Sequence, residues 1–232
     1  MIKNLLKQVY FRISPKYLHI KKDICLPMAW HGSSYGGFFV NESSLNSESI
    51  IYSVGIGKDI SFDESIMDSF NCKIFGFDPT PESIQWFRQQ NVSKMFIFSE
   101  YGISSKSGIV KFHLPKNKNH VSGSILNSSF VSEDRYVDVQ MKTLLDAMNE
   151  HRHSYIDLLK MDIEGAEYEV VSQILEAGVP IKQILVEIHD RFFYNGHIKS
   201  KKMFDQLRNS GFKLFGISKT YEEISFINPS LK

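Results

Sequence analysis

The chain has 232 residues, and its 27 Lys and Arg against 26 Asp and Glu give a formal net charge of +1 at pH 7. That balance calls for no nucleic-acid partner, and a hydrophobic content of 42% is enough for a sizeable core. Two cysteines are too few for a disulfide framework, and no apolar run approaches the ~18 residues that would cross a bilayer. We therefore expect a cytoplasmic protein without a transmembrane segment.

Residues 1–29 form a basic segment that we expect to be largely helical, ahead of a single domain over residues 30–232. Residues 1–22 mix Lys and Arg with apolar side chains but lack the continuous apolar stretch of a secretory signal. A short surface helix is the simpler interpretation. Weak binding of this segment to a membrane surface or to a partner protein is the alternative.

Beyond this segment, short apolar runs alternate with stretches of helical periodicity. Strands are expected over residues 50–54, 72–77, 95–98, 156–161, 184–188, 212–217 and 223–227. Helices are expected over residues 61–70, 143–150, 168–177 and 199–209, with a further one that Thr80 opens and that has Pro81 at its first position. This alternation predicts an α/β fold with a doubly wound, mostly parallel, seven-stranded sheet. The last two strands suit an antiparallel strand at one edge.

Two segments outside this alternation are candidates for loops near a ligand. Residues 30–40 alternate glycines with aromatic residues without a clean period. Residues 115–134 form a long polar loop between two extended runs, and loops of this length are usually functional or mobile. We expect residues 35–37 (Tyr35, Gly36 and Gly37) and residues 120–124 to close over a bound ligand. A pair of ordinary surface loops is the alternative.

The first predicted strand runs into a Gly-Ile-Gly turn at residues 55–57, and the second predicted strand ends on Asp78. A glycine turn followed roughly 20 residues later by an acid is the spacing of a nucleotide-type cofactor site at the edge of a parallel sheet. The glycines admit a ligand close to the backbone, and the acid can accept hydrogen bonds from ribose hydroxyls. Ile60 replaces the third glycine of a typical nicotinamide site, which disfavours a dehydrogenase.

A second group of polar residues follows the fourth and fifth of these strands. Asp162 leaves the end of one, and Glu187 and His189 share a face of the other. A buried acid is costly unless it is paired, and an imidazole suits a general base, so we predict that these three are catalytic. A structural ion pair is the alternative for Glu187, whereas Glu167 suits the dipole of the following helix. The three side chains could also hold a divalent cation, but their spacing is not diagnostic and we assign no metal ligand.

Four motifs together resemble the FkbM-like methyltransferases. They are Tyr-Ser-Val-Gly-Ile-Gly-Lys-Asp at residues 52–59, Phe-Asp-Pro-Thr-Pro at 77–81, Leu-Lys-Met-Asp-Ile-Glu-Gly-Ala-Glu at 159–167 and Val-Glu-Ile-His at 186–189. The third motif is the most specific, and the similarity runs from about residue 30 to about residue 227. The resemblance implies a class I, Rossmann-like methyltransferase fold, S-adenosylmethionine as cofactor, and O-methylation of sugars or polyketide-like metabolites.

The resemblance also implies roles for individual residues. Gly55 and Gly57 would pass under the methionine part of the cofactor, Asp78 would hold the ribose, and Asp162 would face the methyl group. Many members carry an acid at the position of Ser53, and Asp59 is a candidate to compensate. The residues that we expect to bind the cofactor are Tyr35, Gly36, Gly55, Ile56, Gly57, Asp59, Asp78, Pro79, Thr80, Tyr101, Gly102, Ile103 and Asp162, with residues 101–103 bordering the adenine.

We therefore predict an S-adenosylmethionine-dependent O-methyltransferase whose acceptor is a sugar, a glycan or a related small molecule. Two alternatives remain open. An NAD-dependent oxidoreductase would need a hydride-transfer partner that the sequence does not offer. A non-catalytic binding module on the same fold would not need the intact Gly57, Asp78 and Asp162.

Overall fold

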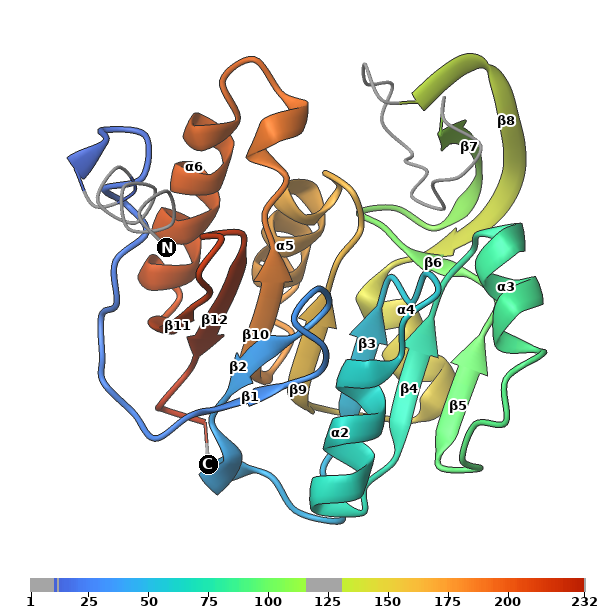
Figure 1. Ribbon diagram of the computed structural model, residues 1–232, viewed down its shortest axis with the longest axis horizontal. Helices are drawn as coiled ribbons and strands as arrows, with labels where there is room; N and C mark the ends of the chain where they lie inside the picture. Colours follow the sequence, from blue (N-terminus) through green and yellow to red (C-terminus); the bar gives the residue numbers. More distant parts are fainter. Residues whose placement is uncertain (1–10, 12, 116–130, 232) are drawn as a thin grey trace.

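The computed structural model describes residues 11, 13–115 and 131–231, and its centre is a seven-stranded sheet. The strands are β3 (Ile51–Val54), β4 (Ile74–Phe77), β5 (Phe96–Ser99), β9 (Ile156–Met161), β10 (Ile181–Glu187), β11 (Lys213–Ile217) and β12 (Glu223–Ile227). Their order across the sheet is β11-β12-β10-β9-β3-β4-β5 (Figure 1). All neighbours from β10 to β5 pair in parallel, whereas β12 runs antiparallel to both β10 and β11. The predicted α/β class, with a mostly parallel sheet and an antiparallel strand, is confirmed.

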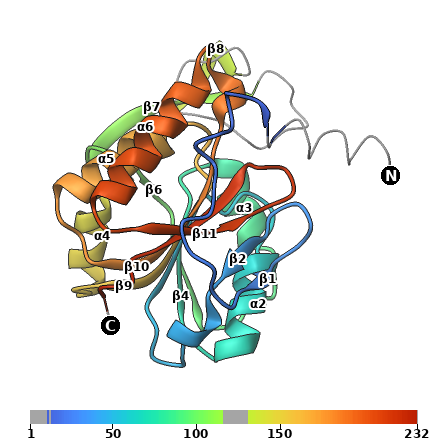
Figure 2. The ribbon, with the colours of Figure 1, turned by 90° about the vertical axis from the view of Figure 1, so that its left-hand side faces the viewer.

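Helices cover both faces of the sheet. They are α2 (Ser61–Phe70), α3 (Pro81–Phe87), α4 (Leu144–His151), α5 (Glu167–Glu176) and α6 (Gly196–Asn209). Figure 2 shows α4, α5 and α6 on one face and α2 and α3 on the other. The ends of these helices follow local signals. Pro81 occupies the first turn of α3, Thr143 caps α4 by accepting a hydrogen bond from the Asp146 amide at 3.1 Å, and Asn71 ends α2 in the left-handed region.

The sheet is buried on both sides, as expected of parallel strands that helices cover. Every residue of β3 and of β4 is buried, including the polar Ser53. Phe204 of α6 packs in the core cluster on one face. Phe62 of α2 packs with Phe38 in the cluster on the other face. Since side chains fill both faces, a ligand has access at the rim where the parallel strands end.

The segment of alternating glycines and aromatic residues is a β-hairpin. Strands β1 (Ala29–His31) and β2 (Phe38–Val40) pair antiparallel, and β2 lies against β12. The Trp30 ring meets Phe39 edge-on at 5.1 Å, and a Cβ on Gly37 would come within 2.5 Å of that Trp30 ring. The hairpin was not predicted from the sequence because strands of three residues are too short to show a period of two.

A second, three-stranded sheet stands beyond the ends of β3, β4 and β5 (Figure 1). It consists of β6 (Gly102–Ile103), β7 (Gly108–Pro115) and β8 (Val131–Lys142). The predicted long loop over residues 115–134 is therefore too long, because Pro115 belongs to β7 and residues 131–134 belong to β8. Residues 116–130 lie outside the described residues, and so does the predicted closing segment 120–124.

Residues 1–10 and 12, which make up much of the predicted N-terminal helix, also lie outside the described residues. Residues 14–28 form turns and extended chain that reach β11. The Asp23 carboxylate accepts a hydrogen bond from the Leu214 amide at 2.9 Å and pairs with Arg208 at 3.0 Å. None of the helices in the described part of the chain is long and apolar enough to cross a membrane.

Candidate active site

A cavity of about 490 Å³ opens at the carboxyl ends of β3, β4 and β9. Open parallel sheets place their ligands at this rim. The predicted cofactor residues that line the cavity are Tyr35, Gly36, Gly55, Ile56, Gly57, Asp59, Asp78, Pro79, Thr80, Gly102, Ile103 and Asp162. Segments from distant parts of the chain therefore meet around one space.

Tyr101 is the one predicted cofactor residue that the cavity lining does not include. Its hydroxyl donates a hydrogen bond to Glu150 at 2.9 Å, its ring contacts Phe77 at 5.5 Å, and the Lys142 ammonium lies 4.2 Å from the ring centroid. The side chain thus belongs to the packing between β4 and α4, while its neighbours in β6 reach the cavity.

Asp78 holds the glycine turn in place. Its Oδ2 accepts hydrogen bonds from the amides of Ile56 at 3.0 Å and Gly57 at 2.8 Å, and its Oδ1 accepts one from the Thr80 amide at 2.8 Å. Burial raises the pKa of this carboxyl, and the amide hydrogen bonds oppose that shift. The acid at the end of β4 is therefore a fixed acceptor whose orientation is set by backbone groups.

The two glycines of the turn serve different purposes. Both have positive φ, +79° at Gly55 and +58° at Gly57. A Cβ on Gly55 would lie 1.7 Å from the Asp162 carbonyl oxygen, so the close approach of β3 to the end of β9 demands glycine there. A Cβ on Gly57 would have no atom within 4 Å. Gly57 therefore leaves open space in the cavity.

Charged side chains that the sequence analysis did not assign to the site lie beneath the turn. Lys160 is buried, lines the cavity and donates a hydrogen bond to the Gly55 carbonyl at 2.6 Å. Asp63 of α2 is 1% exposed, and its Oδ1 has no hydrogen-bond partner among the described residues. Burial raises the pKa of Asp63 to about 6, although the charge of Lys160 opposes the shift. A lysine between Leu159 and Met161 in a buried strand was the available signal for Lys160.

Asp59 lies next to this pair at the mouth of the cavity. Its carboxylate accepts hydrogen bonds from the Ser61 amide at 2.8 Å and the Ser33 hydroxyl at 3.0 Å. Burial raises the pKa of Asp59, but these hydrogen bonds outweigh burial and leave the pKa below its usual value. Asp59 is therefore an anion that the hairpin turn and the start of α2 hold together.

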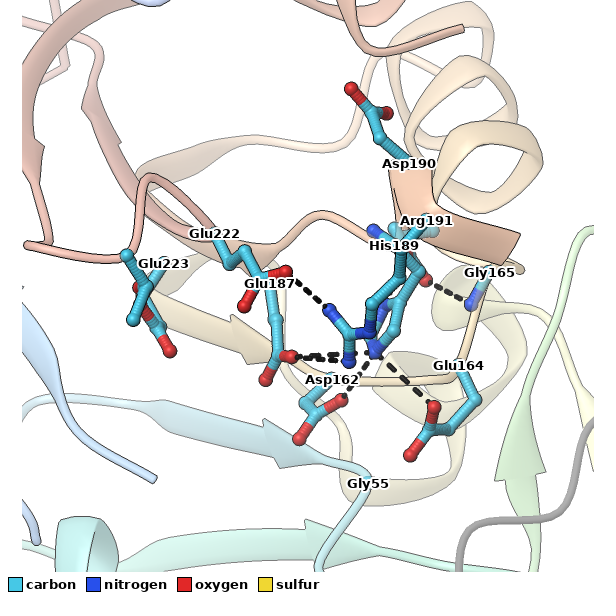
Figure 3. A network of polar contacts seen from close by, with 12 residues as sticks. Gly55, Asp162, Glu164, Gly165, Glu187, His189, Asp190, Arg191, Glu222 and Glu223 are labelled. Atoms are coloured by element: carbon cyan, nitrogen blue, oxygen red, sulfur yellow. Dashed lines mark hydrogen bonds and ion pairs between the residues drawn. The ribbon is translucent and has the colours of Figure 1, made fainter. Parts of the chain in front are cut away.

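The second polar group forms around His189 (Figure 3). The His189 side chain is 1% exposed, and its Nδ1 lies 2.7 Å from Glu167 Oε1. Glu167 is fully buried and also accepts hydrogen bonds from the amides of Gly165 at 2.9 Å and His189 at 3.2 Å. Glu167 does lie in the first turn of α5, but the helix-dipole interpretation misses its main contacts. It orients His189.

The other ring nitrogen of His189 faces three carboxylates. Its Nε2 lies 3.2 Å from Glu164 Oε2, 3.4 Å from Glu187 Oε1 and 3.6 Å from Asp162 Oδ1. Figure 3 shows these side chains converging from the ends of β9 and β10. The structure therefore brings together the predicted group of Asp162, Glu187 and His189, and it adds Glu164.

The electrostatics of this cluster are dominated by negative charge. Burial alone lowers the pKa of His189, but the surrounding carboxylates, Glu167 foremost, raise that pKa well above its usual value. Burial and the charge of Asp162 raise the pKa of Glu187. Arg191 offsets part of the charge, through ion pairs with Glu187 at 3.2 Å and Glu222 at 2.8 Å. Such a cluster can take up a proton or bind a cation.

Asp162 connects the two parts of the site. It lines the cavity together with Glu164, whereas Glu187 and His189 are not in the lining. Tyr35 borders the same cavity from the hairpin turn, with its side chain 83% exposed. A ligand in the cavity would thus reach the carboxylate cluster at Asp162 and Glu164.

Comparison with known proteins identifies similar sequences and folds. The family model of the methyltransferase FkbM domain matches residues 45–214. The 2-O-methyltransferase NoeI of Sinorhizobium fredii is 28% identical over 150 residues, which cover 58% of this chain and 61% of that protein. The probable methyltransferase-like protein 24 of Homo sapiens is 26% identical over 146 residues, covering 62% of this chain and 33% of that protein. The chain thus spans between about a third and three fifths of these relatives.

A solved structure shares the fold. The crystal structure of methyltransferase FkbM from Methylobacillus flagellatus superposes with a TM-score of 0.50 at 11% identity, covering 97% of this chain and 54% of that chain. At this identity the likeness concerns the fold alone.

Proposed function

The chain belongs to the FkbM family of methyltransferases, and from this premise we propose that it transfers a methyl group from S-adenosylmethionine to a hydroxyl of a sugar or glycan. In this reaction the bond between the sulfonium sulfur and the methyl carbon breaks as the acceptor oxygen bonds to that carbon. The hydroxyl proton passes to a base, and S-adenosylhomocysteine leaves as a neutral thioether. The observation that carries the proposal is the position of Asp162, which borders both the cavity and the carboxylate cluster.

The cavity offers a partner for each part of the cofactor. Asp78 lines the cavity with its carboxylate fixed by three backbone amides, which makes it the candidate acceptor for a ribose hydroxyl. Ile103, Phe112 and Met141 supply apolar contacts for the adenine. A volume of about 490 Å³ lies within the usual range of cofactor sites.

The amino acid end of the cofactor is placed over Gly57, where the cavity has room. Its carboxylate is assigned to Lys160, and its ammonium to Asp63, whose Oδ1 has no partner in the described part of the chain. An unpaired buried carboxylate oxygen is costly, so a bound ammonium would relieve that cost. Asp59, already held by Ser61 and Ser33, adds negative charge on the same side.

The reactive methyl group then points toward Asp162. Methyl transfer mainly requires alignment of the acceptor oxygen with the sulfonium methyl, which a rigid rim of strands can provide. Asp162 and His189 are the candidate bases, and Glu187 completes the predicted catalytic group. Substitution of His189 by Ala is expected to lower turnover far more than affinity for S-adenosylhomocysteine, because a base acts in the transition state.

A sugar acceptor is supported by two observations. The carboxylates at the mouth of the cavity can accept hydrogen bonds from several hydroxyls, and the exposed Tyr35 ring offers an apolar face to a sugar ring. The similarity to a protein named as a 2-O-methyltransferase supports a hydroxyl as the acceptor group. A polyketide-like hydroxyl is the second candidate within the same reaction, and the cytoplasmic location stays a prediction.

Calorimetric titration with S-adenosylmethionine, S-adenosylhomocysteine and NAD tests the cofactor. We expect binding of the first two and none of NAD, and the opposite pattern would favour the oxidoreductase. Transfer of a radiolabelled methyl group to a panel of monosaccharides, oligosaccharides and polyketide-like alcohols then tests the acceptor. Label found only in the last group would replace the sugar by that class.

A further inference from the structure

The carboxylate cluster leaves two buried polar atoms without a hydrogen-bond partner among the described residues. They are His189 Nε2 and Asp162 Oδ1, which lie 3.6 Å apart. The His189 side chain is almost wholly buried, so water from outside does not solvate its ring. Buried polar atoms normally have partners, and an exception calls for an explanation such as an ion.

Glu167 determines which nitrogen of His189 is available. Its Oε1 lies 2.7 Å from Nδ1, so Nδ1 carries the hydrogen and donates it. When the ring is neutral, as a cation ligand must be, the Nε2 lone pair faces the carboxylate oxygens of Glu164, Glu187 and Asp162. A lone pair among anionic oxygens is repulsive unless a positive charge lies between them. A carboxylate behind a histidine in this way is the usual support of a metal-binding imidazole.

The spacing of the atoms fits the coordination edges of a small cation. Oxygen and nitrogen ligands about 2.1 Å from an ion lie about 3.0 Å apart at right angles and about 3.4 Å apart at the tetrahedral angle. The three distances from Nε2 are 3.2, 3.4 and 3.6 Å. One ligand atom from each of Asp162, Glu164 and His189 lies within 4.8 Å of the others.

We propose that Asp162, Glu164 and His189 bind a divalent cation, with Glu187 as a fourth ligand. The mixture of carboxylate oxygens and one imidazole nitrogen suits a first-row metal such as Mn²⁺. Asp162 and Glu164 border the cavity, so the open coordination positions face it. The cation would bind the acceptor hydroxyl and lower its pKa; this acceptor role rests on the function proposed above, whereas cation binding does not. His189 is then a ligand, and the proton passes to a carboxylate.

The test is a titration of the full chain with Mn²⁺ after removal of metals by a chelator, with free Mn²⁺ measured by electron paramagnetic resonance. We expect one bound Mn²⁺ per chain. Glu164→Gln should weaken binding at least tenfold, and Glu167→Gln, which disturbs the support of His189, by about 10–100-fold. Glu222→Gln is the matched control, because Glu222 belongs to the same network through Arg191 but does not touch His189. That control should bind Mn²⁺ like the unmodified chain.

Two results would overturn the proposal. One is a free Mn²⁺ signal that the full chain does not reduce, which would assign the cluster to an imidazolium ion. The other is equal Mn²⁺ binding by the Glu164→Gln and Glu222→Gln variants. Circular dichroism shows whether each variant folds, and the partly exposed Glu164 makes its variant the one most able to do so. Titration of the same samples with S-adenosylhomocysteine tests the two proposals separately. If the chain binds S-adenosylhomocysteine but not Mn²⁺, only the proposed cation site is contradicted.

Discussion

Asp78 and the cluster around His189 lie at the same rim of one sheet, but they differ in how far their polar atoms are hydrogen-bonded. The Asp78 carboxylate accepts hydrogen bonds from three backbone amides. At the ends of β9 and β10, three carboxylates converge on one imidazole whose Nε2 has no hydrogen-bond partner in the part of the chain that the structure describes. The first region is organised by the chain itself. The second is complete only when a proton or a cation joins it.

The difference has a local origin in the two turns. The turn after β3 contains glycines, so its amides can point at Asp78 without strain. The turn after β9 places Glu164 at φ 53°, a left-handed conformation that costs a residue with a side chain about 1–2 kcal/mol. Figure 3 shows the Glu164 carboxylate directed at His189. In the first region, glycines let the backbone amides point at Asp78. In the second, a left-handed backbone conformation directs the Glu164 carboxylate at His189.

The comparison predicts the largest stability effect at Glu167, which holds the second region together. Glu167→Ala removes the partner of His189 and of two amides in a fully buried place. Breaking a buried charged pair in this way is expected to lower the free energy of unfolding by about 3–5 kcal/mol. Urea denaturation in the presence of a chelator measures it. Glu169→Ala, on the exposed side of the same helix, should change the value by no more than about 0.5 kcal/mol, and equal losses would contradict the role of Glu167.

Asp78 is expected to show an effect on both stability and binding. Asp78→Ala leaves three amides unpaired, which should cost about 1–3 kcal/mol in the free energy of unfolding. It should also weaken S-adenosylhomocysteine binding by about 2 kcal/mol, or about thirtyfold, through the lost ribose hydrogen bond. Denaturation and calorimetry measure the two effects. Asp68→Ala on the exposed face of α2 serves as the control, and unchanged affinity of the Asp78 variant would remove Asp78 from the site.

Asp63 extends the comparison, because its buried carboxylate, like that of Asp162, has one oxygen without a hydrogen-bond partner among the described residues. Burial raises its pKa to about 6, so the ionised form that pairs with an ammonium is lost as the pH falls below 6. Affinity for S-adenosylhomocysteine should therefore be about tenfold weaker at pH 5 than at pH 8, since one unit below the pKa leaves about a tenth of the groups ionised. Calorimetry across that range measures it. An Asp63→Asn variant should bind weakly with a flatter profile, and identical profiles would exclude Asp63 as the partner.

The features of the fold and the site that could be predicted from the sequence are those that depend on neighbouring residues. The α/β class, the succession of strands and helices, and the position of Asp78 follow from apolar runs, helix caps and the spacing between a glycine turn and an acid, all of which are local. The contacts of Glu167 and Lys160 could not be predicted in this way, because they join segments far apart in the chain. The family resemblance places Tyr101 at the adenine together with Gly102 and Ile103, but side chains alternate in direction along an extended segment, and the Tyr101 side chain packs elsewhere.

The smallest expected effect is that of replacing Gly57. Comparison with Gly178 distinguishes the backbone strain that the substitution causes from the space that it fills in the cavity. Gly57 and Gly178 share a positive φ, +58° and +64°, and a Cβ on either would meet no atom within 4 Å. Substitution by Ala should therefore lower the free energy of unfolding by about 1 kcal/mol in both. Only Gly57 lines the cavity, so only Gly57→Ala should also weaken S-adenosylhomocysteine binding, by displacing the methionine part of the ligand. Denaturation and calorimetry on the two variants test this pairing. Equal affinities would mean that the cofactor does not approach the turn, and that Asp78 organises a backbone that touches no ligand.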